Sequence, residues 1–519
     1  MAKQSREKLN SAIWSIADGL RGSVDGWDFK TYVLGTMFYR FISEDIEKKI
    51  NENEHNAGDT AFKYSEISDE MAEIIRAECI NDFGYFLLPS QLFCNVVKEA
   101  ESNDDLNITL ENVFKDLESS SAGSASEADF SGLLDDFDVN NKKLGENVVT
   151  RNKNLVKLLR GVEEMELDGD GNNADVFGDA YEFLMGMYAS QAGKSGGEYF
   201  TPAEVSELVT RLGTVGKTKV ESVYDPACGS GSLLLKSLKV LGKDSVTRGF
   251  FGQEKNITTF NLCRINMFLH GVPFNKFSIE HGDTLINPQH LEEKPFELVV
   301  SNPPYSVHWE GEDDPKLIND PRYAPAGVLA PKTKADFAFI LHMVNHLASN
   351  GKAVVVCSTG ILTRGGDELK IRQYLVKENF VEAVVQLPGN LFFGTGISPC
   401  IMVLAKNKKS TGTFFINASN EFIKDGNQNR LTGENINKIV SVFTSREEIK
   451  HFSHTATLEQ IENNGFDLSV TRYVELEKKK QQIDMAKINA EIALHIEKIN
   501  ELREKANKIV AETEQETSE

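Results

Sequence analysis

The chain has 519 residues, of which 40% are hydrophobic and 26% are charged, which indicates a globular protein of about three domains rather than a disordered chain. Acidic residues outnumber basic ones by 78 to 56, which gives a formal net charge of −22. Because nucleic-acid binding depends on neutralising phosphates, DNA would repel this chain on its own: either the substrate is not nucleic acid, or a basic partner brings the DNA.

The first ten residues, MAKQSREKLN, lack the apolar core of a signal peptide, and no apolar run reaches about 18 residues. We therefore expect a cytoplasmic protein. The cysteines are scattered without a C-x-x-C pair or zinc-site spacing, which predicts reduced, mostly buried thiols and no metal site. They are Cys79, Cys94, Cys228, Cys263, Cys357 and Cys400.

Residues 1–165 are predicted to form a helical N-terminal domain, because apolar residues recur at helical spacing over 13–20 and 33–42. Within it, residues 101–140 contain eleven carboxylates against one lysine, Lys115, and include the linker-like run SSSAGSAS. We expect this part to be a solvated or mobile acidic segment; mimicry of nucleic-acid charge is the alternative.

Residues 166–470 are predicted to form an α/β domain with a mostly parallel sheet that helices cover on both faces. Short β-rich runs alternate with helical patterns, and in such a sheet ligands bind beyond the carboxyl ends of the strands. The runs are SVYD (222–225), FFGQE (250–254), FELVVSN (296–302), AVVVCST (353–359) and VEAVVQLP (381–388).

Residues 471–519 contain a single apolar stripe that steps by three or four residues from Met485 to Ile509. This spacing is typical of a coiled-coil-like helix for subunit contact, and an amphipathic helix packed on its own domain fits it equally well.

A glycine-rich turn, Asp225-Pro-Ala-Cys-Gly-Ser-Gly-Ser232, follows the first predicted strand and leads into a helix over 232–241. Glycines let the backbone approach a ligand, and a helix start offers free N–H groups. The dinucleotide fingerprint needs a third glycine where Leu234 stands. Glu254, at the end of the next strand, suits two ribose hydroxyls, so we predict a nucleoside-bearing cofactor, which is not necessarily NAD.

Two further segments flank this turn. Upstream, Thr201 and Pro202 predict a helix start, with Thr201 as the N-cap and Pro202 as the first helical residue. Downstream, Asp283 follows a predicted third strand, where its carboxylate suits an adenine amino group; a structural turn aspartate is the alternative.

The sequence Ser301-Asn302-Pro303-Pro304-Tyr305 follows a buried strand. An exocyclic amine is a poor nucleophile because its lone pair is delocalised into the ring, and two acceptors for its N–H bonds would localise that pair. The Asn302 side-chain oxygen and the Pro303 carbonyl supply such acceptors in a stiffened turn. Tyr305 offers a face on which an extruded base can stack. A rigid surface turn is the alternative.

The order of these motifs along the chain resembles that in the class I S-adenosylmethionine-dependent methyltransferases, and more closely that in the modification subunit of type I restriction–modification systems. The motifs are residues 197–203, DPACGSGS, FFGQE, HGD and SNPPY. The resemblance implies a Rossmann-like, seven-stranded sheet in the α/β domain and transfer of methyl from S-adenosylmethionine to adenine N6 in DNA. It also implies a separate specificity subunit that reads the sequence of double-stranded DNA, two modification subunits for each specificity subunit, and a nuclease subunit as a further possible component. Residues 308–334 are too short to read bases and suggest a loop that closes over the substrate.

The resemblance assigns catalysis to Asn302, Pro303, Pro304 and Tyr305. It assigns cofactor binding to Glu198, Tyr199, Phe200, Thr201, Pro202, Ala203, Asp225, Cys228, Gly229, Ser230, Gly231, Ser232 and Glu254, and the position of Asp283 after the third strand adds that residue to the predicted cofactor site. The alternatives are a methyltransferase acting on protein glutamine, a DNA methyltransferase that recognises its own site, and a non-catalytic assembly subunit.

Overall fold

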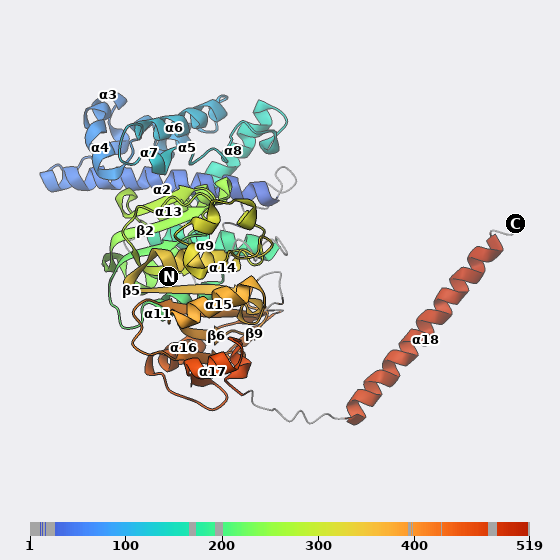
Figure 1. Ribbon diagram of the computed structural model, residues 1–519. Coiled ribbons are helices and arrows are strands. Elements are labelled where there is room, and N and C mark those ends of the chain that lie inside the picture. The colour runs from blue at the N-terminus through green and yellow to red at the C-terminus, as the bar shows by residue number, and fades with distance from the viewer. Residues whose placement is uncertain are drawn as a thin grey trace. The chain divides into compact units, whose positions relative to one another are not determined.

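The computed structural model describes residues 11, 13, 16, 26–165, 173–191, 201–392, 396, 398–426, 428–475 and 485–516. The described residues up to Glu475 form one compact unit, and the helix α18 (Met485–Glu516) belongs to a second. Within the larger unit, a helical region is followed by a sheet with helices on both faces (Figure 1).

The helical region is organised around one long helix, α2, whose buried face includes Val33, Met37, Phe38 and Ile42. This is the apolar spacing that the sequence predicts for 33–42. Its helices are α2 (Gly26–Ala57), α3 (Asp69–Ala72), α4 (Arg76–Phe83), α5 (Phe93–Glu99), α6 (Leu106–Ser120), α7 (Glu127–Phe130) and α8 (Val148–Glu163).

The acidic segment 101–140 is not a solvated linker, so that expectation is wrong. It forms α6 and α7, and it buries Leu110, Leu117, Phe130 and Phe137 in the core. The apolar residues of α6 recur every three or four positions, so the carboxylates occupy only the outer face of an amphipathic helix.

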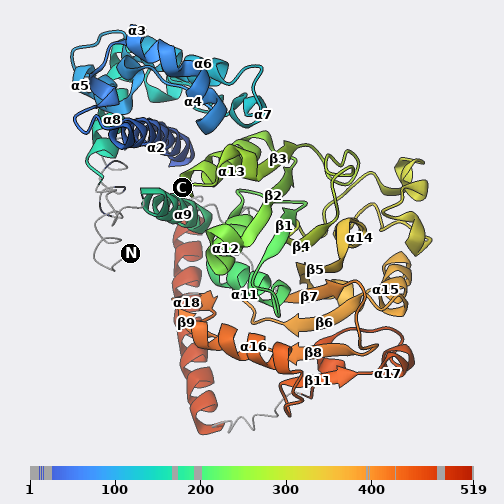
Figure 2. The same cartoon turned by 90° about the vertical axis from the view of Figure 1, so that its left-hand side faces the viewer.

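Arg264 joins this segment to the sheet-containing region. Its buried guanidinium donates to the carbonyls of Ala128 and Ser131, at 2.8 and 2.9 Å. Close by, the rings of Phe130 and Phe268 lie 5.0 Å apart. The helical region and one face of the sheet therefore share a continuous core (Figure 2).

The sheet has the strand order β11-β8-β6-β7-β5-β4-β1-β2-β3. Neighbours in the series β5-β4-β1-β2-β3 run parallel, whereas β7 is antiparallel to both β5 and β6. The strands located from the sequence correspond to β1 through β6, whereas β7, β8 and β11 bring the sheet to nine strands. Its strands are β1 (Val220–Asp225), β2 (Val246–Glu254), β3 (Phe277–His281), β4 (Phe296–Ser301), β5 (Leu347–Ser358), β6 (Val381–Gln386), β7 (Pro399–Ala405), β8 (Thr413–Asn417) and β11 (Ser453–Ala456).

A separate two-stranded sheet is formed by β9 (Ile423–Asp425) and β10 (Gln428–Arg430). The Asn429 side chain donates to the carbonyl of Gly389, which ties this hairpin to the segment after β6.

Helices cover the large sheet on both faces (Figure 2). Along β4 and β5, alternate residues enter different cores: Val300 and Val354 lie in one core, Val299 and Val355 in the other. This alternation is the period of a strand that is buried on both faces. The helices that follow the N-terminal region are α9 (Asn173–Gln191), α11 (Ala203–Gly213), α12 (Ser232–Leu241), α13 (Ile257–Leu269), α14 (Asp336–His346), α15 (Asp367–Lys377), α16 (Gly433–Ser445) and α17 (Leu458–Asn463).

The helix α18 carries the predicted stripe, and its residues Ile492, Ile496, Ile499 and Leu502 are each about half exposed or more. Among the described residues, no helix combines the length and the apolar character that crossing a membrane requires.

Candidate active site

The glycine-rich turn lies at the carboxyl end of β1, in the bend that leads into α12. Gly229 and Gly231 have φ values of +54° and +83°, which other residues rarely adopt. A Cβ on Gly231 would lie 2.9 Å from Cys263 Sγ on α13, so this position also permits close packing. The turn therefore needs glycine for both its backbone conformation and its fit against α13.

Glu254 ends β2 beside this turn. One carboxylate oxygen accepts from the Gly229 amide at 3.0 Å, and the other accepts from the Asn256 amide at 2.8 Å. Burial raises the pKa of the Glu254 carboxyl. The carboxylate is thus held in a fixed orientation before a ligand binds.

Asp225 ends β1 and is almost fully buried. Its Oδ1 accepts from the Ala227 amide at 3.0 Å and from the Ser301 hydroxyl at 2.8 Å. Burial raises the pKa of Asp225 to about 7, and the nearby charge of Glu254 acts in the same direction. Through Ser301, Asp225 links the glycine-rich turn directly to the SNPPY turn.

Asn302 has both ends of its amide engaged. Its Nδ2 donates to the Thr201 hydroxyl at 3.0 Å, and its Oδ1 accepts from the Tyr305 hydroxyl at 2.8 Å. The helix α11 begins at Ala203 with Pro202 in the cap position, so the prediction that Thr201 caps this helix and Pro202 is its first residue is wrong by one residue. The Thr201 hydroxyl is used instead to orient the Asn302 amide.

Tyr305 is half-buried and packs against the core. Burial raises its pKa well above the usual value, so the phenol is neutral and can donate. The next residue, Ser306, has a φ of +51°, and its amide donates to the Asp336 carboxylate at 3.2 Å. Arg364 donates to the Ser306 hydroxyl at 3.3 Å. These contacts fix the position of Ser306, the residue that follows the SNPPY turn.

Cys228 is committed to contacts within the protein. Its amide donates to the Gln253 carbonyl at 3.1 Å, and its carbonyl accepts from the Gly231 amide at 2.8 Å. The thiol is buried against Cys263, and contact with that thiol together with burial raises the Cys228 pKa. These contacts give Cys228 a role in shaping the turn.

The remaining predicted residues surround the same turn. The Ser230 and Ser232 hydroxyls lie 3.4 Å apart, and the Ser230 carbonyl accepts from Asn266 Nδ2 at 2.7 Å. Asp283 accepts from the Leu285 amide and forms an ion pair with Lys255 at 2.8 Å. An adenine amino group would therefore share this carboxylate with Lys255.

Glu198, Tyr199 and Phe200 lie outside the described residues. The structure adds Ser301 and Thr284 to the site: Thr284 Oγ1 donates to the Pro226 carbonyl at 2.6 Å. Ser301 could have been found from the sequence because it immediately precedes Asn302, whereas the sequence gives no local signal for Thr284.

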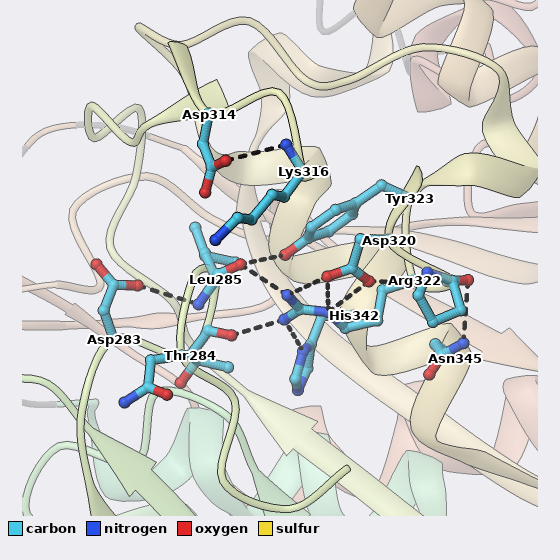
Figure 3. A network of polar contacts seen from close by, with 12 residues as sticks. Asp283, Thr284, Leu285, Asp314, Lys316, Asp320, Arg322, Tyr323, His342 and Asn345 are labelled. Atoms are coloured by element: carbon cyan, nitrogen blue, oxygen red, sulfur yellow. Dashed lines mark hydrogen bonds and ion pairs between the residues drawn. The ribbon is translucent and has the colours of Figure 1, made fainter. Parts of the chain in front are cut away.

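Residues 308–334 do not form a free loop over the substrate. Arg322 and Tyr323 are buried, and both donate to the Leu285 carbonyl (Figure 3). The segment is anchored to the turn after β3, which contradicts the interpretation of a lid.

A mostly parallel sheet with a glycine-rich turn after β1, an acidic residue at the end of β2 and an Asn-Pro-Pro-Tyr turn after β4 defines a methyltransferase of class I architecture. Residues 172–482 match the family described as N-6 DNA methylase, and residues 9–162 match the family described as HsdM N-terminal domain.

The chain is 45% identical to the methylase subunit of the type I restriction enzyme MpnII from Mycoplasma pneumoniae, over 98% of this chain and 96% of that one. It superimposes on a type I methyltransferase subunit from Streptococcus thermophilus with a TM-score of 0.82 and 34% identity, covering 91% of this chain and 100% of the other. A type I restriction–modification structure with 18% identity shares the fold, with a TM-score of 0.65 over 97% and 98% of the two chains.

The chain therefore belongs to the methylase subunits of type I restriction–modification systems, which are adenine-specific DNA methyltransferases that use S-adenosylmethionine.

The residues present suit this cofactor. S-adenosylmethionine carries a ribose diol, which matches the two-oxygen acceptor of Glu254, and a cationic sulfonium, which favours buried carboxylates such as Asp225. The left-handed glycines of the turn leave its backbone free of side chains where a ligand would approach.

Proposed function

We propose that Asn302 and Pro303 hold the N6 amino group of an adenine that has left the DNA helix, while residues around Asp225 and Glu254 hold S-adenosylmethionine. The observation that carries this proposal is the 2.8 Å contact between Ser301 and Asp225. It makes the SNPPY turn and the glycine-rich turn immediate neighbours.

When bound, S-adenosylmethionine supplies an electrophilic methyl group on its sulfonium. The Asn302 oxygen and the Pro303 carbonyl accept the two N–H bonds of the amine and so localise its lone pair. Thr201 keeps the amide in the orientation that presents its oxygen, because the hydroxyl accepts from the other end of Asn302. Pro304 limits the freedom of the turn, and Tyr305 provides a stacking face.

We assign cofactor binding to the turn from Asp225 to Ser232, to Glu254, to Asp283 and to the segment 198–203. Glu254 takes the ribose hydroxyls, since its two oxygens already accept from two backbone amides at the rim of this turn. Cys228 and Gly231 contribute by shaping the turn against α13.

We further propose that recognition of the DNA sequence belongs to a separate specificity subunit, with two copies of this chain for each copy of that subunit and a nuclease subunit as a further component. The net charge of −22 supports a division of labour in which a basic partner brings the DNA. The complex would act in the cytoplasm, where its DNA substrate lies.

The proposed division of the chain is 1–165, 166–470 and 471–519, with the last part making the subunit contact. The family matches at residues 9–162 and 172–482 support the first boundary. The apolar stripe of α18 supports the third part, because an apolar face of this length is typical of a helix that packs against a partner.

The test is a methylation assay with tritiated S-adenosylmethionine and DNA, with and without the specificity protein. We expect label at adenine N6 only when the partner is present. Label on DNA without the partner would show that the chain recognises its own site, and label on protein would show a different substrate; either result overturns the proposal.

A further inference from the structure

Every N–H group of the Arg322 guanidinium contacts a neighbouring residue, and these neighbours include the turn that carries Asp283 (Figure 3). Nη1 donates to the Thr284 carbonyl at 2.7 Å, and Nη2 donates to the Leu285 carbonyl at 2.8 Å. Nε and Nη2 also donate to the Asp320 carboxylate, at 2.9 and 2.7 Å. The side chain of Arg322 is only 1% exposed.

His342 extends this network towards β1. Its Nδ1 lies 3.1 Å from Arg322 Nη1, and because a guanidinium only donates, Nδ1 accepts and Nε2 carries the hydrogen. Nε2 then donates to the Tyr224 hydroxyl at 2.8 Å. Burial, together with the charges of His346 and Arg322, lowers the His342 pKa well below its usual value, which keeps this ring neutral. Tyr224 directly precedes Asp225.

The two carbonyls that Arg322 holds belong to the turn after β3. In this turn the Leu285 amide donates to the Asp283 carboxylate at 3.0 Å, and the Thr284 hydroxyl donates to the Pro226 carbonyl at 2.6 Å. Tyr323 adds a second donor to the Leu285 carbonyl at 3.0 Å. The position of this turn against the glycine-rich turn therefore depends on a segment that follows the SNPPY sequence.

We infer that Arg322 is a positioning residue for S-adenosylmethionine: it fixes the turn that carries Asp283 against the turn that begins at Asp225. The inference rests on the proposed cofactor site. Without the guanidinium, the buried Thr284 carbonyl loses its donor, the Leu285 carbonyl keeps only the Tyr323 hydroxyl, and the Asp283 turn can shift away from Pro226. Because Arg322 lies in the segment after Tyr305, it also links the cofactor side of the site to the base side.

The test measures the Kd for S-adenosylmethionine by titration calorimetry on the full chain, for Arg322→Gln and Arg322→Lys. We expect Arg322→Gln to raise the Kd about tenfold, as for the loss of a hydrogen bond to a charged group. Arg322→Lys should recover part of this loss, because an ammonium can reach one carbonyl but cannot span two. An unchanged Kd in a folded Arg322→Gln protein overturns the inference.

Arg248 provides the matched control. Its guanidinium also donates to a carboxylate and a carbonyl, those of Glu293 and Lys294, and it lies over the Phe251 ring at 4.6 Å, but it stands near the amino end of β2, away from the site. Arg248→Gln should lower the melting temperature and leave the Kd unchanged. If both variants raise the Kd equally, Arg322 acts only through general stability and the inference fails.

If Arg322→Gln does not fold, two milder variants test the inference about Arg322. Tyr323→Phe removes one donor to the Leu285 carbonyl, and Asp320→Asn weakens the partner of the guanidinium. Each should raise the Kd by about two- to fivefold, a fraction of the full loss; an unchanged Kd in both overturns the inference.

A turnover measurement adds a second readout. In the complex with DNA and the specificity protein, the variants should raise the KM for S-adenosylmethionine and keep kcat at saturating cofactor within about threefold, as expected when ground-state binding is weakened. A fall in kcat alone contradicts the inference. Glu254→Gln distinguishes a failure of the proposed cofactor site from a failure of the inference about Arg322. If the Kd for S-adenosylmethionine is unchanged in Glu254→Gln as well, the proposed cofactor site is wrong. If the Kd is unchanged only in the Arg322 variants, only the inference about Arg322 fails.

Discussion

The cofactor side and the base side of the site differ in how their polar groups are satisfied. At Glu254 and Asp225 the partners are mostly backbone amides at strand ends, so these carboxylates have fixed orientations and their remaining lone pairs are available to a ligand. At the SNPPY turn, the proposed acceptor oxygen of Asn302 already accepts from the Tyr305 hydroxyl.

We infer from this difference that the groups proposed for the cofactor are oriented in advance, whereas the Asn302 oxygen proposed for the base is already engaged by Tyr305. A flipped adenine must compete with Tyr305 for the Asn302 oxygen. Preorganised groups lose little freedom on binding, so the two halves should respond differently when their polar groups are removed.

Replacement of Asn302 by alanine tests the base side with the largest expected effect. Loss of the oriented acceptor should lower the methylation rate about 100- to 1,000-fold, as when one preorganised hydrogen-bonding group is removed from a transition-state site. The Kd for S-adenosylmethionine should stay the same, because Asn302 is proposed to touch only the base. The measurements are single-turnover methylation and calorimetry.

Asn350→Ala is the control, since this amide bonds to Glu297 at the amino end of β4, away from the site. It should keep wild-type turnover. Loss of cofactor binding in Asn302→Ala would mean that the two sides are not separate.

Replacement of Glu254 by glutamine tests the cofactor side. An amide offers one acceptor where the carboxylate offers two, so the Kd for S-adenosylmethionine should rise about 10- to 100-fold. Turnover at saturating cofactor should change much less than the Kd. A variant with normal affinity would show that the ribose is not held at the end of β2.

Much of the cofactor side could be predicted from the sequence because its groups follow directly after buried strands. The predicted strands at 222–225 and 250–254 are parts of β1 and β2, and Asp225 and Glu254 end them. In a parallel sheet, strand ends meet at one edge, so local patterns were sufficient to bring these residues together.

The contacts that cross long stretches of chain could not be predicted in this way. Thr201 was interpreted as a helix cap because that is the local role of such a residue, yet its partner Asn302 is 101 positions away. Arg322 lies in a segment rich in proline and aspartate, a composition that favours a loop. Its burial depends on carbonyls 37 and 38 positions away, which no local pattern indicates.

The prediction of a solvated segment at residues 101–140 was wrong for a different reason. The charge count of this segment concealed an amphipathic pattern in α6, in which Leu106, Leu110, Val113 and Leu117 face the core while the carboxylates of this helix lie outside it. Periodicity was the stronger signal here, because burial of a helix depends on one face and not on net charge.

Asp225→Asn tests whether ionisation of the buried Asp225 carboxyl lowers the stability of the folded protein. With a folded pKa of about 7 against an ordinary value near 3.8, the folded protein keeps a proton that the unfolded chain releases. This contribution to stability is complete below the unfolded pKa and is lost as the pH rises towards 7. The asparagine variant lacks it, so its stability relative to wild type should rise by up to about 1.4 kcal/mol per pH unit within this window and stay constant above it.

Urea unfolding of both proteins without cofactor, at several values between pH 5 and 8, measures this difference. The same variant should bind S-adenosylmethionine more weakly at pH 8, because it lacks the ionised carboxylate that we propose to attract the sulfonium. Parallel pH profiles for the two proteins would mean that Asp225 titrates normally and that the cofactor side carries no such cost.

Tyr305→Phe has the smallest expected effect and tests the closed state of the base side. The phenylalanine keeps the ring for stacking and removes the hydroxyl that occupies the Asn302 oxygen, so methylation should remain within about threefold of wild type, with an equal or lower KM for DNA. Tyr305→Ala should lose about tenfold, because it removes the stacking face itself. If the phenylalanine variant is as inactive as Asn302→Ala, the Tyr305 hydroxyl helps to hold the adenine amine. The hydrogen bond between Tyr305 and Asn302 would then persist during catalysis, and an incoming base would not displace it.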